Sequence, residues 1–387
     1  MVRRIFLLAA VLLFALALSP KIEASGGLIP YESENIDYEA EYKAFTEAIP
    51  EDIASVLPEG VFSGSEDARL KASETVIAPA YFFEVILDML GFHIKDALHM
   101  LARLIGIIIL SALANAALKN FSGERIREAF SFCSLSAVLI IVMGEQFGLI
   151  RAVDNFLSRL VGLVNAMIPL MGVLYAFAGN VTTAAVSGSS LAFFIAICQN
   201  LFSATLMPAV GISLSFSAVS AFSGKSGTQR ISSFFKNLYT YGLGLLMSVF
   251  ALVMSTQNEL AAKADSLGAR AAKFAVGSFI PIAGGAVGDS LRTVAASAEY
   301  IKSSVGGLGI AVIILLVLPL IISLILTRLS LSLSAAVAGM LGCEKEERLL
   351  SEVGGACGYM LAVCALCSVL FIYALTLFIR CNSAFYF

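Results

Sequence analysis

The stretch GLGIAVIILLVLPLIISLILT, residues 307–327, decides the fold class of this 387-residue chain. It contains no charged residue, and its length matches the roughly 20 apolar residues that a helix needs to cross the hydrocarbon core of a bilayer. Comparable apolar runs lie at 99–118, 129–149, 160–179, 186–206, 207–223, 238–256 and 355–379. These runs predict seven or eight transmembrane helices, depending on how the pair around Pro208 is counted.

The composition of the whole chain agrees with a membrane protein. Hydrophobic residues make up 59% of it, charged residues make up 14%, and the mean hydropathy is +0.90, whereas an ordinary soluble protein carries about 25% charged residues. We therefore predict an all-α, polytopic integral membrane helix bundle. The net charge of −3 leaves no basic surface for a nucleic acid. The seven cysteines lie within or beside apolar runs and do not form a disulfide framework.

The N-terminus has the pattern of a secretory signal peptide over residues 1–24. Two arginines precede a short apolar run, and we expect cleavage after Ala24. An uncleaved membrane anchor is the alternative, because short spans and signal sequences overlap in length. In both cases the next residues are exported. Residues 25–96 are therefore expected to form an acidic extracytoplasmic helical segment, in which twelve acidic residues outnumber three basic ones before position 75.

The distribution of charged residues divides the chain after residue 96 into three segments. Residues 97–256 are expected to form a first transmembrane group, and residues 307–387 a C-terminal transmembrane pair. With the N-terminus exported, the basic turns near Arg127 and Lys225 fall in the cytoplasm, as the positive-inside tendency requires. Residues 257–306 are assigned outside although they are also basic. There the spacing predicts two amphipathic helices at the membrane interface.

Between these two helices lies GSFIPIAGGAVGDS, residues 277–290, which is apolar but too short to span a membrane. We predict a re-entrant hairpin, shielded at membrane depth by surrounding protein, and a surface hairpin is the alternative. The similar word NAMIPLMG at 165–172 is compatible with an internal repeat and with chance matching of apolar words. The residues expected to serve structure and assembly here are Pro281, Gly284, Gly285, Gly288 and Asp289.

No motif in the sequence indicates enzymatic chemistry. The word SGKS at 223–226 lacks the earlier glycine of a phosphate-binding loop. Cys364 and Cys367 have the spacing of a redox pair, but in an apolar helix we interpret them as packing residues. We therefore expect no catalytic residue, no cofactor and no metal site, and we expect that the chain is not an enzyme.

Two groups of polar residues stand close to the apolar runs. His93, Asp96 and His99 occur at three-residue steps and could ligate a metal ion, but without a further ligand cluster we interpret them as interfacial polar residues. A second group lies at the end of the run 129–149 and after it, where a functional site in the membrane and an interfacial helix between two spans are the alternatives. Its members are Glu145, Arg151, Asp154 and Arg159.

The stretch 277–290, continuing through KSSVGGLG at 302–309, closely resembles the stage III sporulation protein AE family. The exported acidic segment and the polytopic body are similar as well, and the likeness is strongest from 274 to 345. The resemblance implies an endospore-forming bacterium and a multi-pass protein in the mother-cell membrane that surrounds the forespore.

The resemblance also implies a function and partners. Such proteins belong to the channel formed by the stage III A sporulation proteins, which include an ATPase subunit, and by stage II sporulation protein Q across the intermembrane space. The channel supports late forespore gene expression. Membrane lipid is a further expected partner, and nucleic acid is not. The alternative function is an autonomous secondary transporter of a small solute that uses the repeat interface, the charged group near Glu145, or Gln199 and Asn200 inside a span. The third and least favoured hypothesis is a redox enzyme that uses Cys364 and Cys367.

Overall fold

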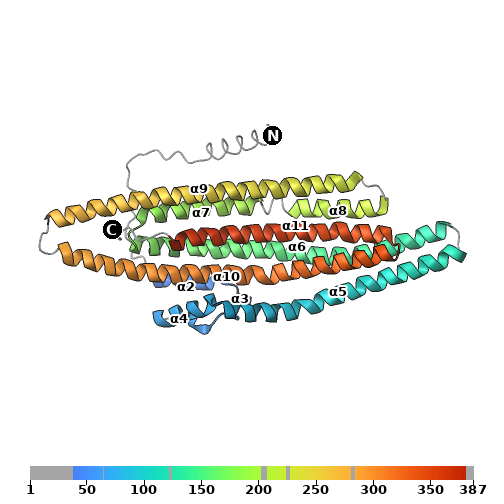
Figure 1. Cartoon of the computed structure of the whole chain (residues 1–387), viewed down its shortest axis with the longest axis horizontal. Coiled ribbons are helices and arrows are strands. Elements are labelled where there is room, and N and C mark those ends of the chain that lie inside the picture. Colours follow the sequence, from blue (N-terminus) through green and yellow to red (C-terminus); the bar gives the residue numbers. More distant parts are fainter. Residues whose placement is uncertain are drawn as a thin grey trace, which may run out of the picture. The chain divides into compact units, whose positions relative to one another are not determined.

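The computed structural model is all-α in the residues it describes, which are 38–63, 65–121, 124–201, 207–223, 227–279 and 284–380 (Figure 1). The chain divides into two units, Met1–Asp37 and Tyr38–Phe387. The expected signal peptide, its cleavage site after Ala24 and the first part of the acidic segment lie outside the described residues. Within the second unit, the predicted all-α fold class is confirmed.

The second unit begins with four short elements: α2 (Tyr38–Glu47), α3 (Glu51–Ala54), the 3-10 helix η1 (Glu59–Phe62) and α4 (Glu66–Ile77). Pro50 and Pro58 directly precede α3 and η1, where a missing backbone N–H is tolerated because the first turn of a helix leaves it unbonded. Phe45, Val61 and Val76 are fully buried and belong to the same apolar core as the long helices. The described part of the acidic segment, residues 38–77, therefore consists of short helices whose apolar side chains are covered.

Five long helices account for most of the second unit: α5 (Pro79–Phe121), α6 (Glu124–Phe177), α9 (Gly227–Phe279), α10 (Gly284–Met340) and α11 (Glu344–Arg380). Each contains a stretch long and apolar enough to cross a membrane. Two shorter apolar helices, α7 (Val181–Leu201) and α8 (Met207–Ser223), lie between α6 and α9 in sequence. The described residues thus give five candidate spans, fewer than the number of apolar runs.

Helix α6 contains two of the predicted spans. The runs 129–149 and 160–179 predict separate spans, but α6 continues without interruption over 54 residues to Phe177. The segment between the runs contains no proline or glycine, and charge alone does not end a helix. At 1.5 Å per residue such a helix is about 80 Å long, which is far more than the roughly 30 Å of a bilayer core.

The two amphipathic helices predicted in 257–306 are helical, but they are not separate elements. The first is the C-terminal part of the 53-residue α9, and the second is the N-terminal part of the 57-residue α10. An interfacial placement would require a bend between the spanning and the amphipathic part, and neither helix is interrupted there. Residues 280–283, the centre of the expected re-entrant hairpin, lie outside the described residues.

The core of the unit lies where α6, α10 and α11 meet. Met167 of α6 and Leu375 of α11 both face Gly309 of α10, so closely that a Cβ atom at Gly309 would overlap the end of the Met167 side chain. A glycine at this position lets the three helices approach one another. The turn between α10 and α11 contains Gly342 with φ of +76°, a left-handed conformation that glycine adopts without steric cost.

Candidate functional site

The residues predicted to serve assembly lie where α9 ends and α10 begins. Gly284, Gly285, Gly288 and Asp289 fall in the first turns of α10, and Pro281 lies outside the described residues. Three other junctions between helices hold polar side chains that are buried or ion-paired, and the sequence did not identify them.

The first junction joins α2 to α4 around Arg69. Its guanidinium donates two hydrogen bonds to the Glu39 carboxylate, at 2.6 and 3.0 Å, and a third to the Ser63 backbone oxygen at 2.5 Å. The same group lies over the ring of Tyr42, 4.3 Å from its centroid. A bidentate ion pair together with a cation–π contact fixes the orientation of the two helices more firmly than a single surface ion pair would.

Two titratable groups in this junction have shifted pKa values. The hydrogen bonds from Arg69 favour the ionised form of Glu39 and lower the pKa of its carboxyl. Burial raises the pKa of Tyr42 to about 12, and its hydroxyl donates to the Val61 backbone oxygen at 3.1 Å. At neutral pH Glu39 is therefore charged and Tyr42 is neutral, which is the combination that the junction requires.

The N-terminal helices are in turn docked on the long helices. Arg159 of α6 donates hydrogen bonds of 2.8 and 3.0 Å to the two Asp52 carboxylate oxygens. The Tyr300 hydroxyl of α10 donates to Glu74 at 3.2 Å. Close to this contact, the end of the Ile77 side chain fills the space that a Cβ atom would need at Gly307. The acidic segment is thus held on α6 and α10 by charge, hydrogen bonding and close packing.

The second junction centres on Glu346 in the first turn of α11. This carboxylate is 2% exposed and accepts hydrogen bonds of 3.1 Å from Ser111 of α5 and from Ser134 of α6. The positive end of the α11 dipole also favours a carboxylate here. One buried carboxylate therefore ties three helices together, and it brings the α5–α6 and α10–α11 connections to the same end of the bundle.

Further polar contacts follow α11 away from this end. The Ser220 hydroxyl of α8 donates to Glu352 at 3.3 Å, and the fully buried Gln146 of α6 bonds to the Cys357 sulfur at 3.2 Å. Cys364 and Cys367 are fully buried among apolar side chains. Their surroundings are those of packing residues rather than of an accessible redox pair.

The third junction joins α9 to the N-terminus of α7. Asp265 is 7% exposed and accepts hydrogen bonds from the backbone N–H groups of Thr182 and Thr183, both at 2.8 Å, and from the Thr183 hydroxyl at 2.7 Å. Asp265 therefore acts as an N-cap supplied by another helix. Along the rest of α7, which lies beside α9 (Figure 1), Ser187 contacts Asn258 at 2.6 Å, Ser190 contacts Gln257 at 2.5 Å, and Phe194 stacks on Phe250 with ring centroids 3.7 Å apart.

The sequence indicates one side of this third junction, the polar side chains of α7. Thr183, Ser187 and Ser190 recur at helical spacing, which indicates one polar stripe on an otherwise apolar helix. No local pattern identifies their partners on α9. Gln199 and Asn200, predicted as a polar pair inside the span, have side chains outside the described set.

The remaining charged residues of the two predicted groups have different surroundings. Arg151 and Asp154 are both exposed and form no ion pair with each other, although their spacing allows one. His93, Asp96, His99 and Glu145 line a cavity between α5, α6 and α10. Within the described residues, no group of three or more His, Cys, Asp or Glu side chains is placed to hold a metal ion.

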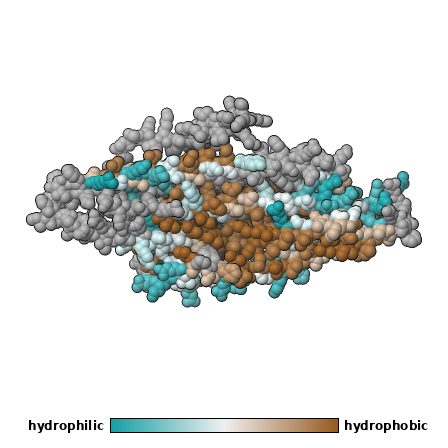
Figure 2. All heavy atoms as spheres, viewed as in Figure 1, coloured by the Kyte–Doolittle hydropathy of each residue, from teal (hydrophilic) through white to brown (hydrophobic). Residues whose placement is uncertain are grey.

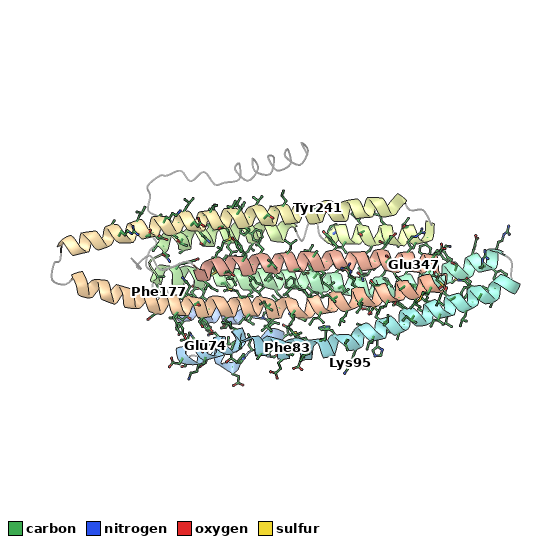
Figure 3. All side chains as sticks on the ribbon, in the orientation of Figure 1. Glu74, Phe83, Lys95, Phe177, Tyr241 and Glu347 are labelled. Carbon is green, nitrogen blue, oxygen red and sulfur yellow. The ribbon has the colours of Figure 1, made fainter. Side chains whose placement is uncertain are left out.

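Exposed apolar side chains extend along most of the long helices. Figure 2 shows apolar surface continuing over a large part of the face in view. On α6 they run from Ile126, 57% exposed, through Ile140 at 73% to Phe147 at 55%. Phe177, at the C-terminal end of the helix, is 47% exposed (Figure 3). The 22 residues from Ile126 to Phe147 correspond to about 30 Å of helix. On α5 the exposed apolar residues run from Phe83 to Leu113.

Comparison with known proteins identifies one family. The sequence profile described as stage III sporulation protein AE matches residues 66–381, which is most of the chain. A relative named stage III sporulation protein AE, from Bacillus subtilis (strain 168), is 26% identical over 247 residues. That match covers 64% of this chain and 62% of the relative, so less than two thirds of the relative's length is represented. No solved structure matches the chain.

Proposed function

The chain belongs to the stage III sporulation protein AE family, which gives it a role in sporulation, and we propose that it is a membrane subunit of the multiprotein channel linking the mother cell to the forespore. In this proposal it is a multi-pass protein of the mother-cell membrane around the forespore. It supports late forespore gene expression by forming part of the channel, and it has no catalytic role of its own.

The length of the exposed apolar surface carries the proposal. The exposed apolar residues of α5 extend from Phe83 to Leu113, which is about 45 Å of helix. A bilayer core about 30 Å thick covers about two thirds of that length. Exposed apolar patches outside a membrane mark interaction sites. The apolar side chains that extend beyond the bilayer therefore require protein neighbours, which a multisubunit complex supplies.

The proposed partners are the other stage III A sporulation proteins and stage II sporulation protein Q. An ATPase subunit among them supplies the energy. The sequence SGKS at 223–226 is not a complete phosphate-binding loop, so we do not assign ATP hydrolysis to this chain. Helices α2–α4 would face the space between the two membranes, where protein Q lies. Between residues 38 and 77 they carry nine acidic and three basic residues, and the contacts of Arg69 and Asp52 hold them in place as a folded surface.

Purification of the tagged chain from sporulating cells in a mild detergent tests the proposal. We expect the stage III A proteins and protein Q to elute with it in a large complex by size-exclusion chromatography. The same purification from cells lacking the ATPase subunit shows which contacts depend on that partner. Recovery of the chain alone, while the other proteins still elute together, would contradict membership of the complex.

Substitution of the glycines at the start of α10 tests whether this region is needed for assembly. Leucine at Gly284 or Gly285 should reduce recovery of the complex while the chain still inserts into the membrane. Leucine at Gly106 is the matched control, because a Cβ atom at this exposed α5 position meets nothing within 4 Å. Normal recovery with all three variants would remove the assembly role of these two glycines.

A secondary transporter is the second candidate, and the cavity lined by His93, Asp96, His99 and Glu145 favours it. Transporters commonly bind substrate among polar groups between spanning helices. Reconstitution of the purified chain alone into vesicles separates the two functions. Solute uptake by the chain alone supports the transporter, whereas a channel subunit is inactive without its partners.

A further inference from the structure

A cavity of about 450 Å³ lies between α5, α6 and α10, away from the three polar junctions. Its volume falls within the range of small-ligand sites, about 300–1,000 Å³. All three helices around it contain candidate membrane spans. Its polar lining includes Asp96, His99 and Arg103 from α5, Glu145 from α6, and Ser323 and Thr327 from α10.

Four ionisable groups of this lining are exposed to the open space of the cavity. Asp96, His99, Arg103 and Glu145 make no hydrogen bond or ion pair with any part of the chain that the structure describes. By contrast, Glu346, Asp265 and Arg69 each make two or more. Charges among apolar helices are costly unless water or a ligand solvates them. In this cavity, charges of both signs therefore face a common space that water or a ligand can fill.

The signs of these charges restrict the ligand. A purely anionic ligand would meet the carboxylates of Asp96 and Glu145, and a purely cationic ligand would meet the guanidinium of Arg103. A molecule that carries both an oxyanion and an ammonium group satisfies all three. The hydroxyls of Ser323 and Thr327 add donors for the oxyanion, and Arg103 is suited to bind phosphate or carboxylate.

We propose that this cavity binds a zwitterion, with its oxyanion at Arg103, Ser323 and Thr327 and its ammonium group at Asp96 and Glu145. Phosphoethanolamine has this chemistry, both free in solution and as the headgroup of phosphatidylethanolamine. The proposal does not depend on the channel function, because a resident lipid and a transported solute would occupy the same groups.

The test uses the purified full-length chain and two forms of the same probe. Binding of free phosphoethanolamine is measured by calorimetry in detergent. Retention of phosphatidylethanolamine, phosphatidylcholine or phosphatidylglycerol from nanodiscs is measured by native mass spectrometry. We expect phosphoethanolamine, or the lipid that carries it, to bind at least about ten-fold more tightly than phosphatidylglycerol, since the anionic lipid lacks an ammonium group.

Variants assign the binding to the cavity. Arg103→Gln, and the double change Asp96→Asn with Glu145→Gln, should each weaken binding about ten-fold or more, and Arg103→Lys should retain most of it. Lys95→Gln is the matched control, because Lys95 is an exposed charge on α5 that does not line the cavity (Figure 3). Circular dichroism checks that each variant is folded.

Each outcome decides the proposal. Binding of the free probe identifies a soluble ligand, and binding of the lipid alone identifies a headgroup site; both support the zwitterion. Binding of neither form would overturn it. So would equal retention of phosphatidylglycerol, or loss of binding with Lys95→Gln as large as that with Arg103→Gln.

Discussion

The central helices α6, α10 and α11 differ from the outer helices α5 and α9 in how much of their apolar surface is covered. About half of the most apolar window is buried in the central three, 56%, 56% and 50%, against 22% in α5 and 12% in α9. The mean hydropathy of these windows does not follow the same order, because α5, at 2.1, matches α6 at 2.0. The different burial of α5 and α6 therefore follows from their positions in the bundle and not from their apolar composition.

This difference separates two roles for apolar surface. Around Gly309 the central helices pack against one another and form a core. On α5 and α9, side chains such as Leu110, Leu260 and Leu267 are each 66% exposed and remain for lipid or partner proteins. The core should therefore determine stability, and the outer faces should determine assembly.

The largest expected effect is at the centre of the core. Gly309→Leu inserts a side chain where Met167 and Leu375 already lie, and we expect it to destabilise the bundle by about 3 kcal/mol, the upper end for overpacking. Gly144→Leu on α6 is the control, since a Cβ atom there meets nothing within 4 Å. Chemical unfolding in detergent measures both variants, and equal stability would show that the central helices are not closely packed.

Next is the link between the core and the outer helix α5. Glu346→Ala removes the acceptor of both the Ser111 and the Ser134 hydroxyl, and we expect a loss of about 2 kcal/mol. Glu344 lies in the same first turn but is exposed, so Glu344→Ala controls for the helix dipole. Backbone hydrogen exchange in α5 should become faster with Glu346→Ala and should not change with Glu344→Ala. If Glu346→Ala increases exchange in α11 only, Glu346 does not link the helices.

A smaller effect is expected at the N-terminal helices. Arg69→Met removes the ion pair with Glu39 and should cost about 1 kcal/mol, because Glu39 is exposed to solvent. The lowered pKa of Glu39 determines how the stabilisation by this ion pair depends on pH. The stabilisation is complete above the ordinary glutamate pKa of 4.5 and is lost as the pH falls through the lowered value. Limited proteolysis should distinguish variant from wild type at pH 7, and the difference should become smaller in strong acid, where Arg69 keeps only its contacts with Ser63 and Tyr42.

The smallest effect on stability is expected on the outer face of α9. Serine at both Leu260 and Leu267 should change the free energy of unfolding by no more than about 0.5 kcal/mol, as for other exposed positions. Serine at the buried Leu308 of α10 should cost several times more. The α9 double variant should nevertheless be recovered with less of the proposed complex. Full recovery would assign this face to lipid rather than to protein.

Much of the fold was predictable because helical structure is local. Each backbone hydrogen bond of a helix joins residues four apart, so a run such as 307–327 indicates its own conformation. The number of helices was less predictable. Charges between residues 150 and 160 were interpreted as a break between two spans, yet α6 continues through them, because neither proline nor glycine is present.

The polar sites were only partly predictable. His93, Asp96 and His99 attracted attention through their spacing, but nothing in the sequence joins them to Glu145, Ser323 and Thr327 around one cavity. The partners of Asp265 and Glu346 lie 82 and 235 residues away in the chain. Such pairs depend on which helix faces lie against each other.

Composition and the length of apolar runs are properties of the chain alone, and they were enough to predict an all-α membrane bundle. The family was indicated separately, by the resemblance of residues 277–290 and 302–309 to its members. The tertiary structure decided which of those runs share one helix, which helices form the core, and which polar groups are satisfied by a neighbour. The physical reason is that burial depends on neighbouring helices and not on residue type. Leu308 is buried and Leu260 is exposed, although both are leucines in apolar helices, because only Leu308 faces other helices of the core.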